Sequence, residues 1–376
     1  MYRHPDSHAA SFENANLSRV IEAPRANSHV LRRAWLGNLC LALSQIAWAL
    51  LKAVEAAPDN TSRSECKQLA LILSALYLGI RERRMRESDM TPPAEMSEQH
   101  EKARQQSRAA WGAVASGWHA QREELWKASR PVSEWIIRRL DPRPGDTVLE
   151  LAAGLADTGL MAARLVGKSG RVIVTDFTPE MIAAARRRAQ ELGVKNTEFR
   201  VLDAERMDLG TDSVDGVLCR WGYMLMIDPL AAFAETRRVL RPGGRLAFSV
   251  WAERERNPAL SLVGGVLESQ GHVPPPDPEA PSAFAMADPG RIRELAVGAG
   301  FAEAEIEDVT FRWPFANQDA YWHYVTETSA SSSPVLGALS PEAQRAVREQ
   351  VQELARPYRS GEGYDFPAVC INAVTY

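Results

Sequence analysis

Cysteine is scarce in this sequence, and its placement excludes two common kinds of site. The four cysteines form neither a Cys-x-x-Cys pair nor a Cys/His cluster, and they lie far apart, at Cys40, Cys66, Cys219 and Cys370. Zinc sites and disulfide-rich secreted folds both need clustered or patterned cysteines. We therefore expect no metal site, and we expect a reducing compartment, the cytoplasm.

An excess of positive charge is also missing. The chain has 44 lysines and arginines against 48 aspartates and glutamates, which gives a formal net charge of −4. Proteins that hold nucleic acid or an anionic bilayer across a broad surface need a basic field. The composition therefore excludes a general nucleic-acid binder.

Long apolar runs are absent as well. The first twenty residues lack the apolar segment of a secretion signal. Residues 35–51 carry no charge, but this stretch is at the lower limit of what spans a bilayer. Leucine and isoleucine recur there every three or four residues, while Asn38, Gln45 and Lys52 follow one side, which is the pattern of an amphipathic helix.

A second amphipathic pattern at residues 69–80 completes a predicted antiparallel helical hairpin over 30–86, with a membrane-embedded hairpin as the alternative. Pro92-Pro93 then interrupts the chain, so we predict an N-terminal extension, 1–95, and a main domain, 96–376. Because neither hairpin helix can bury its apolar face against one partner, the hairpin must dock either on the main domain or on a second copy of itself. The main domain already has a covering helix at 100–126, so we expect homo-oligomer formation.

Beyond that boundary, short apolar runs alternate with helical patterns. Residues 100–126 read as a helix or broken helix that places Trp111 and Trp118 on one face, either as core aromatics or as a cover. Runs bounded by turn residues predict strands at 147–152, 171–176, 198–202, 215–220 and 245–251. Repeated β–α units of this kind form a doubly wound, mostly parallel α/β sheet.

An acidic residue lies at or near the end of each of the first three strands. Glu150 lies near the end of the first run, Asp176 ends the second, and Asp203 follows the third. Ligands of open α/β sheets bind outside the carboxyl ends of the strands. An ionised carboxylate has two acceptor oxygens, so Asp176 is suited to both hydroxyls of a ribose and Asp203 to the amino group of adenine. Taken alone, Glu150 is equally suited to capping the next helix.

Three nucleotide-binding motifs are missing from the same segment. Gly154 and Gly159 bracket four residues as in a P-loop, but Leu160-Met161 stands where that motif needs Lys and Ser or Thr. The dinucleotide pattern Gly-x-Gly-x-x-Gly is absent. No lysine has a tyrosine four residues before it, as a short-chain dehydrogenase would require. We therefore reject a nucleotide triphosphatase and place a nicotinamide-dependent oxidoreductase among the alternatives.

As a set, the remaining segments resemble the class I S-adenosylmethionine (SAM)-dependent methyltransferases, in the small-molecule branch related to the ubiquinone/menaquinone methyltransferases. The segments that carry the resemblance are WGAVASGW, VLELAAGLADTG, VTDFTPEMI, VLDAERM, FSVW and FPAVCINAVT, within about residues 97–376. The resemblance implies a Rossmann-like sheet of seven strands whose last strand, near 366–375, is antiparallel. It also implies SAM as cofactor, held by Glu150, Ala152, Gly154, Asp176, Phe177, Asp203, Ala204, Arg220 and Trp118. The family usually has Gly-x-Gly-x-Gly after the first acid, whereas here Ala152 and Ala156 flank Gly154.

Residues 252–365 form a predicted insertion that covers the substrate. It contains an aromatic run of Trp313, Phe315, Tyr321, Trp322 and Tyr324. Such a lining favours a small hydrophobic or aromatic acceptor. If the acceptor must lose a proton, His323 is the candidate catalytic base and His272 the second choice, because imidazole titrates near neutral pH. A protein that binds SAM without transferring its methyl group is the remaining alternative.

Overall fold

The computed structural model describes residues 94–277, 280–302 and 304–376. The chain divides into two compact units, Met1–Glu98 and Gln99–Tyr376, and the second contains every strand of the described sheet. The hairpin predicted at 30–86 lies outside the described residues, as does nearly all of the predicted extension, so both stay predictions.

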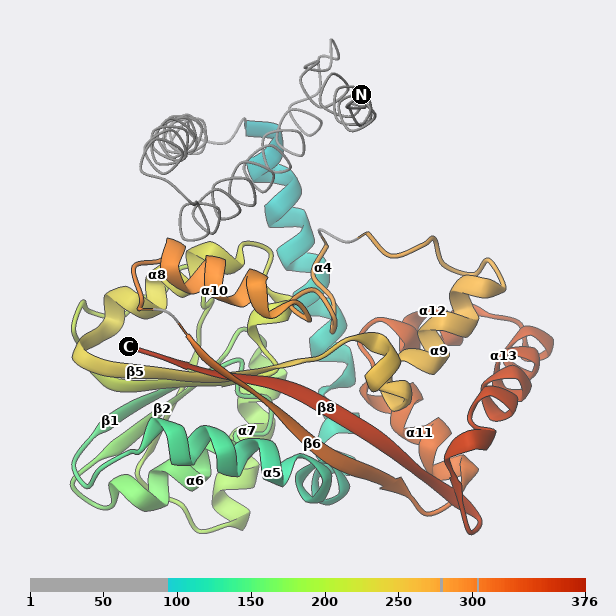
Figure 1. The fold of residues 1–376 in the computed structure, drawn as a ribbon, viewed down its shortest axis with the longest axis horizontal. Coiled ribbons are helices and arrows are strands. Elements are labelled where there is room, and N and C mark those ends of the chain that lie inside the picture. The colour runs from blue at the N-terminus through green and yellow to red at the C-terminus, as the bar shows by residue number, and fades with distance from the viewer. Residues whose placement is uncertain (1–93, 278–279, 303) are drawn as a thin grey trace, which may run out of the picture. The chain divides into compact units, whose positions relative to one another are not determined.

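An eight-stranded sheet in the order β3-β2-β1-β4-β5-β8-β6 forms the centre of the fold, with β7 pairing with β8 alone (Figure 1). Its strands are β1 (Thr147–Leu151), β2 (Arg171–Asp176), β3 (Thr197–Val201), β4 (Val214–Arg220), β5 (Leu240–Trp251), β6 (Glu305–Phe315), β7 (Arg359–Ser360) and β8 (Gly363–Thr375). The first five are parallel, and β8 inserts antiparallel between β5 and β6. The predicted sheet is confirmed, with two-residue β7 as the additional strand.

Helices cover both faces of the sheet, as a doubly wound fold requires. The described helices are α4 (Ala94–Ala120), α5 (Arg122–Leu140), α6 (Asp157–Val166), α7 (Pro179–Glu191), α8 (Pro229–Val239), α9 (Pro258–Ser269), α10 (Pro289–Gly298), α11 (Gln318–Thr328), α12 (Ser332–Ala338) and α13 (Pro341–Leu354). In Figure 1, α5 and α6 lie on one side of the sheet and α8 and α10 on the other.

Thr178-Pro179 and Asp228-Pro229 are sequence signals of a helix start, and α7 and α8 begin there. The Thr178 hydroxyl accepts a hydrogen bond from the Met181 N–H, and the Asp228 carboxylate accepts one from the Ala231 N–H. A proline follows each cap at the first helical position, where its missing N–H costs nothing. These caps fix where each helix leaves the carboxyl edge of the sheet.

One helical segment extends further than predicted. The segment expected at 100–126 is a broken helix, divided at Gln121 into α4 and α5, and α5 continues to Leu140. Pro131 lies inside α5 and reads as a helix breaker in the sequence. The buried face of α5, which includes Val132 and Ile136, packs under the sheet, and this tertiary burial outweighs the cost of the proline.

Candidate functional site

Three acids meet at the carboxyl edge of the sheet. Glu150 lies in β1, Asp176 ends β2, and Asp203 follows β3 by two residues. Since β3, β2 and β1 are adjacent and parallel, their carboxyl ends lie side by side. The structure therefore places the three predicted acids along one edge.

The loop after β1 turns three times through left-handed backbone. Ala152, Gly154 and Ala156 have φ values of 48°, 53° and 62°. Only glycine adopts this region freely, so the two alanines hold a conformation that usually calls for glycine. The loop thus keeps the shape of a glycine-rich loop despite the two alanines.

Asp176, at the end of β2, holds this loop through hydrogen bonds. Its Oδ2 accepts a 3.0 Å hydrogen bond from the Gly154 N–H, and its Oδ1 accepts from the N–H and the hydroxyl of Thr178. Burial raises the pKa of Asp176, although the Thr178 and Gly154 N–H groups oppose that effect. These three hydrogen bonds occupy three of the about four lone-pair sites of the carboxylate, so one site remains, on Oδ2.

Glu150 is buried, and only one of its oxygens has a partner. Its Oε1 accepts a 2.9 Å hydrogen bond from the Gly159 N–H in the first turn of α6, while its Oε2 is buried with no hydrogen-bond partner. Burial raises the pKa of Glu150 to about 8, against the opposing effects of the Gly159 N–H and the Arg220 charge. Glu150 therefore caps α6 with one oxygen, while its other oxygen is buried without a partner.

Arg220 is the basic residue of this group. Its guanidinium hydrogen-bonds the Ser129 hydroxyl from α5 and lies 4.8 Å from the centre of the Trp221 ring. Burial lowers the pKa of Arg220, while the nearby charges of Asp157 and Glu150 act in the opposite direction. Arg220 therefore lies at the end of β4 with its guanidinium on Ser129, within the electrostatic influence of Asp157 and Glu150.

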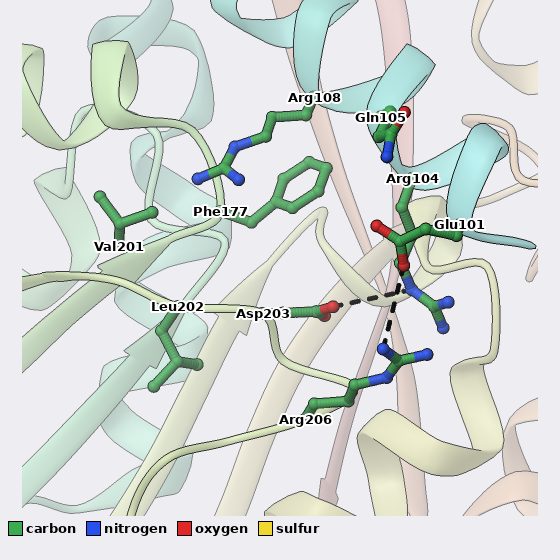
Figure 2. Close-up of a pocket in the computed structure, with 9 residues that line it drawn as sticks. All are labelled: Glu101, Arg104, Gln105, Arg108, Phe177, Val201, Leu202, Asp203 and Arg206. Carbon is green, nitrogen blue, oxygen red and sulfur yellow. Dashed lines mark ion pairs between the residues drawn. The ribbon is translucent and has the colours of Figure 1, made fainter.

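A pocket of about 300 Å³ opens beside Asp203, between α4 and the ends of β2 and β3 (Figure 2). Its lining residues are Glu101, Arg104, Gln105, Arg108, Phe177, Val201, Leu202, Asp203 and Arg206. Figure 2 shows Asp203 pointing towards Arg104, with Arg108 beside the ring of Phe177. Ala204 follows Asp203 and is buried.

Sequence reasoning missed the contribution of α4 to this pocket. Arg104 and Arg108 precede Trp111 by seven and three residues, so they continue the helix face that carries Trp111 and Trp118. This spacing is the sequence signal that could have revealed their role. If the two tryptophans face the core, the arginines on the same face of the helix must also point towards the strand ends.

Trp118 lies over the loop that follows β1. A Cβ on Gly154 would lie 4.0 Å from the Trp118 ring, and the Trp118 indole N–H donates a 2.9 Å hydrogen bond to the Thr328 carbonyl. Trp118 also contacts Trp111 edge to face at 6.0 Å. It therefore serves both as a packed aromatic and as a cover of the loop.

Aromatic rings gather at the ends of β4 and β5. The Trp221 and Trp251 rings stack at 4.3 Å, Trp251 stacks with Trp313 at 5.7 Å, and Trp313 contacts Tyr324 at 5.2 Å. The predicted aromatic run of the insertion is thus brought against β4 and β5. The cluster lies next to Arg220, through Trp221.

The two predicted histidines lie elsewhere. The His323 side chain is exposed on α11, while its neighbours Tyr321 and Tyr324 are buried. His272 follows α9, and its Nε2 lies 3.3 Å from the Gln270 side-chain oxygen. The contacts described for these residues do not link them to the acids, so the base role of His323 stays a prediction without structural support.

The described residues contain neither a cluster suited to a metal ion nor a helix able to span a membrane. Among them, no three His, Cys, Asp or Glu side chains are grouped in a way that suits a metal ion. No helix in the same ranges has both the length and the apolar character needed to cross a bilayer.

Comparison with known proteins identifies a methyltransferase domain at residues 142–263. An arsenite methyltransferase from Halobacterium salinarum is 40% identical over 28% of this chain and 27% of its own length. Two ubiquinone/menaquinone biosynthesis C-methyltransferases are also similar. The one from Acidiphilium cryptum is 37% identical over 32% of this chain and 46% of its own length. The one from Teredinibacter turnerae is 28% identical over 50% of this chain and 76% of its own length.

The first two relatives are thus matched over less than half of their own length. The resemblance to the class I methyltransferases related to the ubiquinone/menaquinone enzymes is confirmed for this part of the chain. The matched region contains the three acids, the left-handed loop and Arg220.

Proposed function

We propose that this chain is a SAM-dependent methyltransferase that modifies a small hydrophobic or aromatic acceptor. The observation that carries the proposal is the placement of Glu150, Asp176 and Asp203 along one sheet edge, around a loop with left-handed backbone. The similarity to methyltransferase domains over residues 142–263 supports it.

The polar groups of SAM match these acids in number and kind. The unpartnered Oε2 of Glu150 suits the ammonium of the methionine moiety, because an unpaired buried oxygen gains most from a charged donor. Asp176 retains one acceptor site, on Oδ2, for a ribose hydroxyl, and Asp203 borders the pocket that would hold adenine. Ala152, Gly154, Phe177, Ala204 and Trp118 would line the remaining surface.

Methyl transfer requires little acid–base chemistry from the protein. Bound SAM supplies the methyl group together with its own leaving group. The chain must therefore hold donor and acceptor in line and exclude water. Trp118 covers the loop, and Arg220, with Glu150 and Asp157 nearby, sets the charge at the end of β4.

The acceptor class rests on the aromatic cluster. Trp221, Trp251, Trp313 and Tyr324 form a continuous series of ring contacts beside Arg220. All four rings are buried, and a hydrophobic or aromatic acceptor that reached them would gain from stacking as well as from burial. A small molecule of that type fits better than a nucleic acid, for which the net charge of −4 is unfavourable.

Calorimetry tests the proposal directly. The protein is titrated with SAM and, separately, with NAD⁺, and a library of small aromatic metabolites is then screened for release of S-adenosylhomocysteine. SAM binding with release in the presence of one acceptor class supports the proposal. SAM binding without release across the library favours the binding protein, and NAD⁺ binding alone favours the oxidoreductase.

The cellular setting belongs to the same proposal. A cytoplasmic location is supported by the unpatterned cysteines, and homo-oligomer formation through residues 30–86 by the amphipathic pattern there. Fractionation of cells that produce the full chain, followed by light scattering of the purified protein, tests both statements.

A further inference from the structure

The side chain of Arg104 lines the pocket and is not fully satisfied. It comes from α4, and only 11% of it is exposed. Its Nε and Nη1 are buried without a hydrogen-bond partner, and Nε lies 3.6 Å from Oδ2 of Asp203, beyond hydrogen-bond distance. Buried donors without partners are costly, so an additional acceptor is expected nearby.

Glu205 holds this arginine in place. The Arg104 Nη2 pairs with Oε2 of Glu205, and Oε1 of Glu205 accepts a 2.7 Å hydrogen bond from the Ile227 N–H. Both Glu205 oxygens are therefore engaged, and only 4% of its side chain is exposed. The guanidinium is anchored through one nitrogen, and of its two unpartnered nitrogens Nε lies beside Asp203.

Arg104 and Asp203 together offer a donor next to an acceptor on one side of the pocket. The edge of adenine that carries N7 presents the complementary pair, since the exocyclic amino group donates and N7 accepts. Asp203 has acceptors only and cannot recognise N7. N1 is left to the backbone that follows Asp203.

We propose that Arg104 is a specificity-determining residue of the cofactor site, which donates a hydrogen bond to N7 of the adenine while Asp203 accepts from the amino group. This inference rests on the proposed function. It makes α4, which precedes the matched methyltransferase domain, a contributor to cofactor recognition.

The other arginines of the pocket are less suited to this role. The side chain of Arg206 is 63% exposed, and its Nη1 lies 3.9 Å from Oε2 of Glu101. Arg108 lies over the Phe177 ring at 5.9 Å. Arg206 therefore provides a matched control, because it borders the same pocket without the buried, unpaired nitrogens of Arg104.

The test compares S-adenosylhomocysteine with its 7-deaza analogue, in which a C–H replaces N7, by calorimetry on the full chain. Wild-type protein is expected to bind the analogue about tenfold more weakly, as a bond from a charged donor would require. Arg104→Met is expected to bind the two ligands equally, whereas Arg206→Met keeps the wild-type ratio. Because Arg104→Met leaves Glu205 unpaired, Arg104→Lys is included, and a reduced ratio is expected.

The ratio of the two affinities separates recognition from packing. If wild-type protein binds both ligands equally, or if Arg104→Met and Arg104→Lys weaken both by the same factor, the inference is overturned. Failure of wild-type protein to bind S-adenosylhomocysteine at all would instead overturn the proposed function.

Discussion

The Gly159 N–H donates a 2.9 Å hydrogen bond to Oε1 of Glu150, and a Cβ placed on Gly159 would lie 2.0 Å from Oε2 of the same carboxylate. Glycine at position 159 thus allows the first turn of α6 to approach the acid in β1. The position of Glu150 depends on that approach.

Gly159→Ala is therefore expected to displace Glu150 and to destabilise the fold by about 1–3 kcal/mol, the usual cost of overpacking. Urea denaturation measures the stability, and calorimetry with SAM measures the affinity, which should also fall. Gly265→Ala in α9 is the matched control, because no atom lies within 4 Å of its added Cβ. Equal stabilities for the two variants would contradict this role of Gly159.

The pKa of Glu150 leads to a pH-dependent difference in stability. Burial raises that pKa from an ordinary 4.5 to about 8. Between these values the unfolded chain has lost the proton that the folded chain keeps, so raising the pH favours unfolding. Relative to Glu150→Gln, wild-type protein should lose stability from about pH 4.5 to pH 8 and then level off. Urea unfolding of both proteins across this range checks the sign, and a constant difference would count against a protonated Glu150.

Asp176→Ala should abolish most SAM affinity. The ribose would lose a charge-assisted hydrogen bond of about 1.5–3 kcal/mol, and the Gly154 N–H would lose its acceptor. Asp203→Ala should weaken binding less, because adenine also gains from apolar contact with Phe177. Calorimetry ranks the two variants, with Asp288→Asn, which retains a helix cap, as the control. The reverse order would show that the roles of the two acids were assigned wrongly.

Ala152→Gly should leave stability unchanged within about 0.5 kcal/mol or raise it, because relief of the left-handed strain offsets the greater freedom of glycine in the unfolded chain. Ala184→Gly in α7 should cost about 1 kcal/mol, as expected for glycine in a helix interior. Thermal unfolding compares the two variants. A loss at Ala152 as large as that at Ala184 would argue against strain in the loop.

Deletion of residues 1–95 should leave SAM affinity within about threefold and lower the oligomeric state, since the pocket residues begin at Glu101 and the hairpin offers apolar faces that need a partner. Calorimetry and light scattering of the shortened and full chains provide the comparison. Loss of SAM binding would make the extension part of the active domain. Partition of the full chain into membranes would favour the embedded hairpin.

The sequence by itself determined the sheet and the acids at its edge. Short apolar runs bounded by turn residues and Pro-initiated helices are local signals, so β1, β2 and β4 and the caps at Thr178 and Asp228 followed from residue type and spacing. The order of parallel β–α units then placed Glu150, Asp176 and Asp203 at one edge.

Only the tertiary structure decided which side chains complete that edge. Arg104 and Asp203 are 99 residues apart in the chain and meet because α4 packs across the ends of β2 and β3. The continuation of α5 past Pro131 and the left-handed Ala152 are likewise held by burial and by long-range contacts that outweigh local preference. Local chemistry therefore specified the scaffold and its acids, whereas packing between distant segments specified the pocket.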